Sequence, residues 1–369
     1  MTILIRFLTG ALFIFSGFIK ANDPMGFGYK LEEYFGVFGI SWLNPAATFL
    51  AAFICVVEMG LGLALLIGWR RMFTLWSLLA MIVFFTFLTF YSAWFNVVTD
   101  CGCFGDFLHL TPWQSFTKDI VLLMMIAWLF FRREQFEALW SNDVRNRLMI
   151  AFVAASGLFS AYTWAYLPLI DFRPYAIGKN IQEGMQIPEG APLDEYKDTW
   201  YYKIDGQTKS FTTDEAPWDL PGAEFVDRKT VLIKKGYTPP VHDFTITDLE
   251  GNDYTEDFLV APATLFVVAY DFKKSRNEAW NEIASIIKWA ELNQLRVAFL
   301  TASTNQQVAA FKEARKADWP IYITDGTTLK TMVRSNPGLI ALKNGTVVDM
   351  WPARSLPSLV ELSELYQID

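Results

Sequence analysis

The chain has 369 residues, of which 53% are hydrophobic, and a formal net charge of -8 at pH 7. This length allows two domains, and the apolar excess is unusual for a soluble enzyme and typical of membrane spans. Residues 1–170 carry ten basic and ten acidic side chains, so the net negative charge lies in the remainder, and the lack of a basic cluster excludes nucleic acid as a partner.

Five apolar runs are long enough to cross a bilayer core of ~30 Å as helices. They lie at residues 3–19, 46–68, 73–96, 115–131 and 149–168. Arginines follow the second and fourth runs, and positive charge in short loops marks the cytoplasmic side. The sequence therefore predicts a bacterial inner-membrane protein with a cytoplasmic N-terminus. The lipid bilayer surrounds its spans, residues 20–45 and 97–114 form outer loops, and the C-terminal domain is periplasmic.

The first run has an alternative interpretation as a cleaved signal peptide, because it is short and follows little charge. Lys20 stands where small residues would be needed before a cleavage site. Cleavage would also leave four spans, which conflicts with the arginine distribution. We therefore expect the first run to be retained as a span.

Glu58 lies close to the middle of the second run. A carboxylate at that depth is costly and usually faces the interior of a helix bundle. We consider it a candidate catalytic residue that relays a proton or binds a polar head group. The alternative is a packing residue that hydrogen-bonds to Tyr91 or Ser92. The small residues that follow, in Glu-Met-Gly-Leu-Gly, let helices approach closely.

The fourth run opens with Lys118 and Asp119, directly after Thr117. Threonine is a favourable residue at a helix N-cap. We therefore expect a helix start here, with both charged side chains at the membrane interface rather than in the core.

The loop between the third and fourth runs reads Asp100-Cys101-Gly102-Cys103-Phe104-Gly105-Asp106. Two thiols one residue apart in an oxidising compartment are candidates for a disulfide, and Gly102 would let the backbone fold tightly enough to form it. Strained disulfides are the more exchangeable ones, so Cys101 and Cys103 are the candidate catalytic pair. The alternatives are a structural clip, two free thiols or, ranked third, a metal site that includes His109.

This loop, the five-span pattern and the opening residues Arg6, Gly10-Ala11, Ser16-Gly17 and Lys20 resemble the DoxX-like and methylamine-utilisation-E-like membrane proteins. The resemblance covers residues 1–131 and implies a four-helix membrane bundle. It also implies a role in thiol–disulfide handling or maturation of exported proteins, with a quinone as cofactor in some relatives. Residues 132–170 would then be a cytoplasmic loop and a fifth span that carries the rest of the chain outside.

After the last span, residues 171–236 are predicted to be an extracytoplasmic connector with some strand. Asp205-Gly206 is a strong hairpin turn signal between strands at 201–204 and 209–212. No active-site pattern occurs in this segment.

Residues 237–369 alternate strands and helices and then end in a hairpin and a helix, which is the order of a thioredoxin-like α/β fold. Strands are expected at 263–270, 296–301, 321–324, 339–343 and 346–351, with helices at 276–292, 304–316, 326–334 and from Leu356. Asn344-Gly345 joins the last two strands. The segment resembles the membrane-anchored, peroxiredoxin-like branch of the thioredoxin family.

In that family a Cys-x-x-Cys pair opens the first long helix, but here the position holds residues 271–276, and no cysteine follows Cys103. Pro337 matches the family's cis-proline, which shapes a peptide-binding surface. The resemblance implies a domain that binds or positions an exported client without exchange chemistry. The favoured function is redox handling by the bundle. The alternative is a non-catalytic envelope scaffold that presents a redox-dead binding domain.

Overall fold

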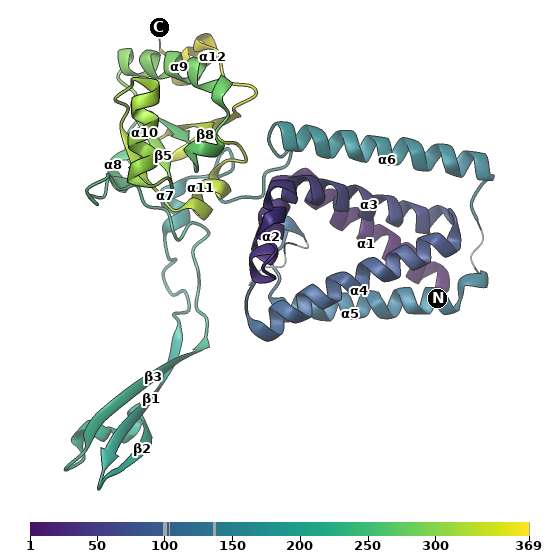
Figure 1. The fold of residues 1–369 in the computed structure, drawn as a ribbon, viewed down its shortest axis with the longest axis horizontal. Coiled ribbons are helices and arrows are strands. Elements are labelled where there is room, and N and C mark those ends of the chain that lie inside the picture. Colours follow the sequence, from purple (N-terminus) through teal and green to yellow (C-terminus); the bar gives the residue numbers. More distant parts are fainter. Residues whose placement is uncertain (99–101, 103, 136–137, 369) are drawn as a thin grey trace. The chain divides into compact units, whose positions relative to one another are not determined.

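The first 170 residues consist mainly of long helices (Figure 1), and these helices are apolar. The computed structural model describes residues 1–98, 102, 104–135 and 138–368. Among these described residues, five helical segments are long and apolar enough to span a membrane, as the sequence predicts: Thr2–Asn22, Ser41–Ile67, Arg71–Phe95, Pro112–Phe131 and Asn142–Ala165. The helices of these spans are α1 (Thr2–Asn22), α3 (Ala47–Ile67, after the 3-10 turn Ser41–Ala46), α4 (Arg71–Phe95), α5 (Pro112–Phe131) and α6 (Asn142–Ala165).

Helix α3 is the central helix of this bundle and packs against α1, α4 and α6. Its contact with α1 depends on glycines: a Cβ on Gly62 would lie 2.7 Å from the carbonyl oxygen of Gly10. The prediction that small residues permit close helix approach is therefore confirmed. Helix α3 ends at Gly68, whose φ of +70° suits glycine.

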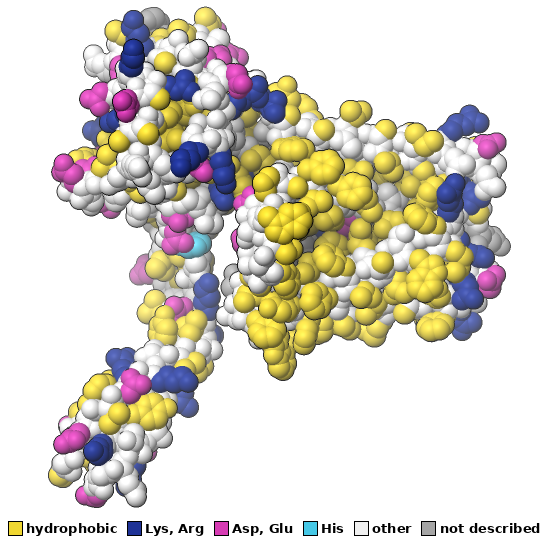
Figure 2. Space-filling view, in the orientation of Figure 1, with side chains coloured by type: hydrophobic (Ala, Val, Ile, Leu, Met, Phe, Trp, Pro, Cys, Tyr) yellow, Lys and Arg dark blue, Asp and Glu magenta, His cyan; other side chains and the backbone are white. Residues whose placement is uncertain are grey.

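The outer flank of the bundle is apolar. Figure 2 shows hydrophobic side chains covering the sides of the helices, and exposed Phe, Trp, Leu and Ile residues come from every span. Such a surface is unusual for a soluble protein and suits a lipid environment.

The N-terminus and both arginine-rich connections lie at one end of the bundle. The Arg71 guanidinium donates to the carbonyl of Arg133 at 2.7 Å, and the Thr2 hydroxyl donates to Gln135 at 3.0 Å. This arrangement agrees with the predicted topology, while the assignment of that end to the cytoplasm stays a prediction.

Two expectations about where helices lie in this half are wrong. The predicted loop at 20–45 is largely helical, since α1 continues to Asn22 and α2 spans Pro24–Val37, capped by the Asp23 side chain. The helix α5 begins six residues earlier than expected, because Thr111 and Gln114 form a capping box ahead of the apolar run, and Thr117 is not its cap.

Residues 180–243 form a separate compact unit. After the short helix α7 (Ile181–Met185), strands β1 (Glu195–Ile204), β2 (Gln207–Thr212) and β3 (Glu224–Lys234) make an antiparallel sheet in the order β2-β1-β3, with 3-10 turns at Thr213–Glu215 and Pro217–Asp219. The predicted hairpin is confirmed, because Ile204 pairs with Gln207 across Asp205-Gly206, which both have positive φ.

The C-terminal residues 244–369 have the predicted thioredoxin-like architecture. The sheet order is β6-β5-β4-β7-β8. Strands β4, β5 and β6 are parallel to one another, and β7 is antiparallel to both of its neighbours, β4 and β8. The strands are β4 (Thr264–Val268), β5 (Arg296–Thr301), β6 (Ile321–Ile323), β7 (Gly338–Lys343) and β8 (Thr346–Pro352). The helices are α8 (Thr255–Leu259), α9 (Trp280–Leu292), α10 (Asn305–Arg315), α11 (Gly326–Met332) and α12 (Leu359–Tyr366).

Buried apolar residues lie on both faces of this sheet: one core cluster includes Leu265 and Val267, while the alternate residue Phe266 packs outside that cluster with Phe244 and Phe258. The inner strands β4 and β7 are buried along nearly their whole length, and Trp280, Phe299 and Phe311 pack with Trp319 in an aromatic cluster. The peptide bond between Asn336 and Pro337 is cis, as expected for this proline, while its role in a binding surface stays a prediction.

Candidate functional site

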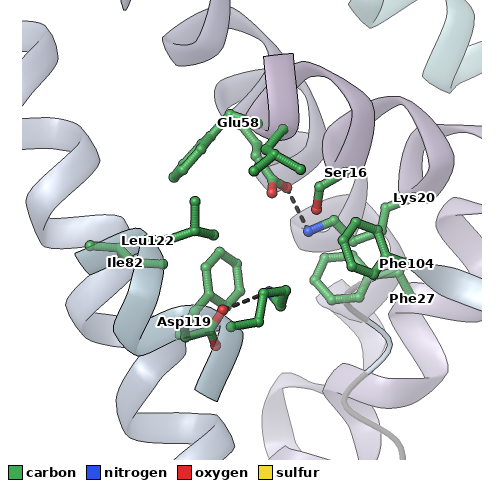
Figure 3. Close-up of a pocket in the computed structure, with 12 residues that line it drawn as sticks. Ser16, Lys20, Phe27, Glu58, Ile82, Phe104, Asp119 and Leu122 are labelled. Atoms are coloured by element: carbon green, nitrogen blue, oxygen red, sulfur yellow. Dashed lines mark hydrogen bonds and ion pairs between the residues drawn. The ribbon is translucent and has the colours of Figure 1, made fainter. Parts of the chain in front are cut away.

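A small cavity lies inside the bundle, between α1, α3, α4 and α5 (Figure 3). Most of its wall is apolar, but two lysines, two carboxylates and a serine also face it. Its lining residues are Leu12, Phe13, Ser16, Lys20, Phe27, Glu58, Ile82, Phe85, Phe104, Lys118, Asp119 and Leu122. Charged groups in apolar surroundings are rare within spans and commonly mark function.

The first charged pair joins α1 to α3. The Lys20 ammonium lies 2.5 Å from the Glu58 carboxylate, and both side chains are almost fully buried. The same ammonium lies 5.1 Å from the ring centroids of Phe27 and Phe85, a cation–π distance. Each charge is therefore compensated by a partner rather than by water.

The alternative in which Glu58 hydrogen-bonds to Tyr91 or Ser92 is wrong, because its partner is Lys20. Ser92 instead lies 3.0 Å from the hydroxyl of Tyr34. The true partner, Lys20, stands 38 residues before Glu58 on another helix, and hydrophobic periodicity gives no indication of which helices face each other.

The second charged pair comes from consecutive residues of α5. The Lys118 ammonium donates to Asp119 at 2.6 Å, and the Thr89 hydroxyl of α4 donates to the other carboxylate oxygen at 3.0 Å. Asp119 is 1% exposed, so the expectation that it lies outside the core of the bundle is wrong. Because α5 begins at Pro112, residue 119 lies two turns inside the helix and faces its neighbour α4.

The cysteine loop adjoins this cavity through its aromatic residue. Phe104 lines the cavity, its ring centroid lies 6.0 Å from that of Phe15, and the Lys118 ammonium lies 5.5 Å from it. Asp100, Cys101 and Cys103 lie outside the described residues. Gly102 and Gly105 have φ of +64° and +50°, the left-handed region that favours glycine, so the motif's glycines suit the local backbone.

Asp106 closes the motif and is held by the C-terminal domain. Arg334 donates to its carboxylate at 2.9 Å. Burial raises the pKa of the Asp106 carboxyl, and the Arg334 charge opposes that shift. Neither the motif nor local periodicity indicates this partner.

Pro337 follows a loop that contacts residues 271–276, the position at which the thioredoxin family has its cysteine pair. The side chain of Asn336 donates to the Asp271 carbonyl at 2.8 Å, and the backbone N–H of Arg276 donates to the Asn336 carbonyl at 2.9 Å. The two loops that would form a thioredoxin active site thus remain together although neither contains a thiol. Among the described residues, no group of three or more His, Cys, Asp or Glu side chains is arranged to hold a metal ion.

Comparison with known proteins divides the chain in the same way. Residues 1–132 match the family model of methylamine utilisation protein MauE, and residues 196–235 match a domain of unknown function, DUF8463. The match supports the methylamine-utilisation-E resemblance of the helices, whereas the DoxX resemblance stays a prediction.

One curated relative is protein TlpB of Flavobacterium psychrophilum, 24% identical over 166 residues. The match covers 44% of this chain and 43% of that protein, so the chain spans less than half of the relative's length.

Two solved structures are similar to part of this chain. A Bacteroides thetaiotaomicron protein assigned as a disulfide isomerase is 17% identical, with a TM-score of 0.28, over 34% of this chain and 82% of that one. A Bacteroides fragilis protein of unknown function is 20% identical, with a TM-score of 0.24, over 33% and 92%. The chain therefore has a MauE-like membrane region at residues 1–132, and the thioredoxin-like architecture of its C-terminal domain rests on its own strand order.

Proposed function

We propose that this chain is a bacterial inner-membrane protein. It exchanges disulfides with exported proteins through Cys101 and Cys103, on the periplasmic side of the inner membrane. The observation that carries this proposal is the position of Phe104, the residue after Cys103, in the wall of a buried cavity that contains two lysine–carboxylate pairs. A nearby ammonium favours a thiolate over a thiol, and the thiolate is the reactive form.

In the proposed reaction, a client thiolate attacks one sulfur of the Cys101–Cys103 disulfide. The S–S bond breaks, a mixed disulfide with the client forms, and the other cysteine leaves as a thiolate. A second client thiolate then attacks the mixed disulfide, which releases the oxidised client and the reduced pair. Two electrons pass from the client to the chain, and the two client thiols lose their protons.

Renewal of the disulfide requires an oxidant, for which we propose a membrane quinone. When bound, a quinone accepts two electrons and two protons. The lining chemistry suits such a group, because Phe13, Phe85 and Leu122 offer an apolar wall and Lys20 and Lys118 are donors of the kind that quinone oxygens accept. The cavity volume of about 50 Å³ is smaller than a ligand pocket of ~300 Å³ or more, so quinone binding requires the cavity to open. The buried carboxylates Glu58 and Asp119 are placed to hold those ammonium groups in position.

The decisive experiment traps the mixed disulfide in cells. We expect Cys103→Ser, or its counterpart Cys101→Ser, to accumulate a client-linked species on non-reducing gels by the reverse exchange. The remaining thiolate attacks the disulfide of an oxidised client, and no second cysteine is present to resolve the mixed disulfide. Cys55→Ser is the matched control, since Cys55 is fully buried in α3 and should behave as wild type. If the double variant lacking Cys101 and Cys103 oxidises exported proteins normally and neither single variant traps a partner, the proposal is wrong.

The second candidate is a non-catalytic scaffold. It is favoured by one observation: the segment 271–276, at the position where the thioredoxin family has its cysteine pair, contains none. Under this alternative, both cysteines are dispensable, while deletion of the C-terminal domain abolishes function. The same trapping experiment therefore separates the two candidates.

A further inference from the structure

The C-terminal domain contacts the membrane bundle of its own chain through Arg334. This side chain follows α11 and precedes the cis-proline by three residues. Its Nε donates to Asp23 at 2.7 Å, its Nη2 donates to Asp106 at 2.9 Å, and its Nη1 donates to the carbonyl of Lys330. Asp23 caps α2, and Asp106 lies three residues after Cys103, so one guanidinium joins three segments that are distant in sequence.

These three side chains are largely buried, so the contact is part of the packed interior and not a surface ion pair. The side chains of Arg334, Asp23 and Asp106 are 6%, 13% and 28% exposed. Burial alone would lower the pKa of Arg334, but the charges of Asp23 and Asp106 raise it overall. A guanidinium suits this position better than an ammonium, because its planar fork of donors reaches two carboxylates at once.

A second set of contacts lies beside the first. The Lys330 ammonium of α11 lies 3.7 Å from Glu32 and 4.6 Å from the ring centroid of Tyr29, both on α2. The Tyr29 ring packs edge-on against Tyr270, at the end of the central strand and next to residues 271–276. The surface of the thioredoxin-like domain around the cis-proline loop is therefore in contact with α2.

Gly26 of α2 makes room for this arrangement. A Cβ at this position would lie 2.8 Å from the Arg334 Nη2 and 2.4 Å from the Asp23 carboxylate. By contrast, a Cβ on Gly36 of the same helix would meet no atom within 4 Å. The two glycines therefore offer a matched pair of substitutions.

We propose that the cis-proline face of the thioredoxin-like domain binds the membrane bundle of its own chain rather than an exported client. In this arrangement Arg334 is a positioning residue that fixes the loop carrying Cys101 and Cys103. The docking itself is independent of the proposed function, whereas the positioning role rests on it. The thioredoxin-like domain, which contains no cysteine, would thereby influence disulfide exchange by holding the loop that carries Cys101 and Cys103.

The docking is tested by cross-linking in intact membranes. Glu32→Cys and Lys330→Cys are introduced into the full chain after its three native cysteines are replaced by serine, and a short bismaleimide is added. We expect an intramolecular cross-link, identified by peptide mapping, that forms at least about tenfold more slowly in Arg334→Glu, equivalent to ~1.4 kcal/mol of docking free energy. Repulsion from Asp23 and Asp106 is the physical reason.

Arg354→Glu is the matched control, because Arg354 is exposed on the same domain. Gly26→Ala should weaken the cross-link through steric overlap, while Gly36→Ala should not. These two variants keep the test informative if Arg334→Glu reaches the membrane poorly. Absence of the intramolecular cross-link in wild type overturns the docking, as does a cross-link found only between two chains. Equal cross-linking in wild type, Arg334→Glu and Gly26→Ala overturns the role of the Arg334 contact in the docking.

The positioning role has a separate readout in the chain with native cysteines. We expect reduced Cys101 and Cys103 to react faster with a membrane-impermeant maleimide in Arg334→Glu than in Arg354→Glu, because the loop has lost its anchor. Loss of the cross-link without any change in thiol reactivity overturns the positioning role. The cross-link is measured without native thiols, so its failure is distinguishable from failure of the proposed function.

Discussion

Replacement of either partner of the buried Lys20–Glu58 pair should destabilise the protein, and by unequal amounts. Lys20→Met leaves Glu58 near the middle of α3, where it must stay charged in apolar surroundings or take up a proton at a cost. Insertion scales give ~2.5–3.5 kcal/mol for such a carboxylate, and removal of one partner of a buried pair costs about 3–5 kcal/mol. We expect about 3 kcal/mol for Lys20→Met.

Glu58→Met should cost less, about 1 kcal/mol, because the remaining ammonium can extend toward the interface. Lys20 is two residues from the end of α1 and has that freedom, whereas Glu58 does not. The double variant should be close to wild type, since two apolar side chains of similar volume replace the ion pair. Such non-additivity is the signature of direct coupling.

Thermal unfolding of the detergent-solubilised protein, followed by tryptophan fluorescence, would measure these differences. A loss of 3 kcal/mol corresponds to a midpoint about 6–12 °C lower for a folding unit of 150–250 residues. Equal losses for the two single variants, or a double variant as unstable as their sum, would refute the reasoning. If the stable double variant still exchanges disulfides, the pair is structural and not part of the chemistry.

Three further predictions concern packing, topology and acid stability. Gly62→Val should destabilise the bundle by about 1–3 kcal/mol through overlap with α1, whereas Gly157→Val, which meets no atom within 4 Å, should not; thermal midpoints would show this. A membrane-impermeant maleimide should label reduced Cys101 and Cys103 in spheroplasts, and labelling only after lysis would reverse the orientation. Hydrogen bonds from a neighbouring threonine lower the pKa of Asp253 below 3.8, so its stabilisation should fade as pH falls through that lowered pKa, and Asp253→Asn should unfold with a weaker acid dependence.

Much of the fold was predictable because it depends on local pattern. The strand at 296–301 has the predicted bounds, since a short apolar run lies between a helix and a turn. Asn344-Gly345 specifies its hairpin through two positive φ values that few other residues tolerate. The five spans follow from length and hydropathy alone.

Helix α2 was missed because its sequence contains three glycines, a proline and charged residues, which are typical of a loop. Its helical state is supported by the Asp23 cap and by packing against α3, and packing is not visible in a local window.

The buried contacts of the site were missed for a related reason. Glu58 is recognisable as unusual because an acid in an apolar run stands out. Its partner Lys20 lies near a span end, where lysine is ordinary, so sequence alone suggests snorkelling. Arg334 and Asp23 are 311 residues apart, and each is unremarkable in its own segment. Ion pairs between elements depend on the tertiary arrangement, which periodicity within one element does not encode.

The positions of the three cysteines limit which residues can form a disulfide with another protein. Cys55 of α3 is fully buried in the bundle, and the soluble domains contain no cysteine. The soluble part can therefore fold in an oxidising compartment without forming a non-native disulfide within itself. Any disulfide that this chain makes with another protein must start from position 101 or 103. A single intermolecular bond found by mass spectrometry in a whole-cell sample would thus identify both the reacting site and the client.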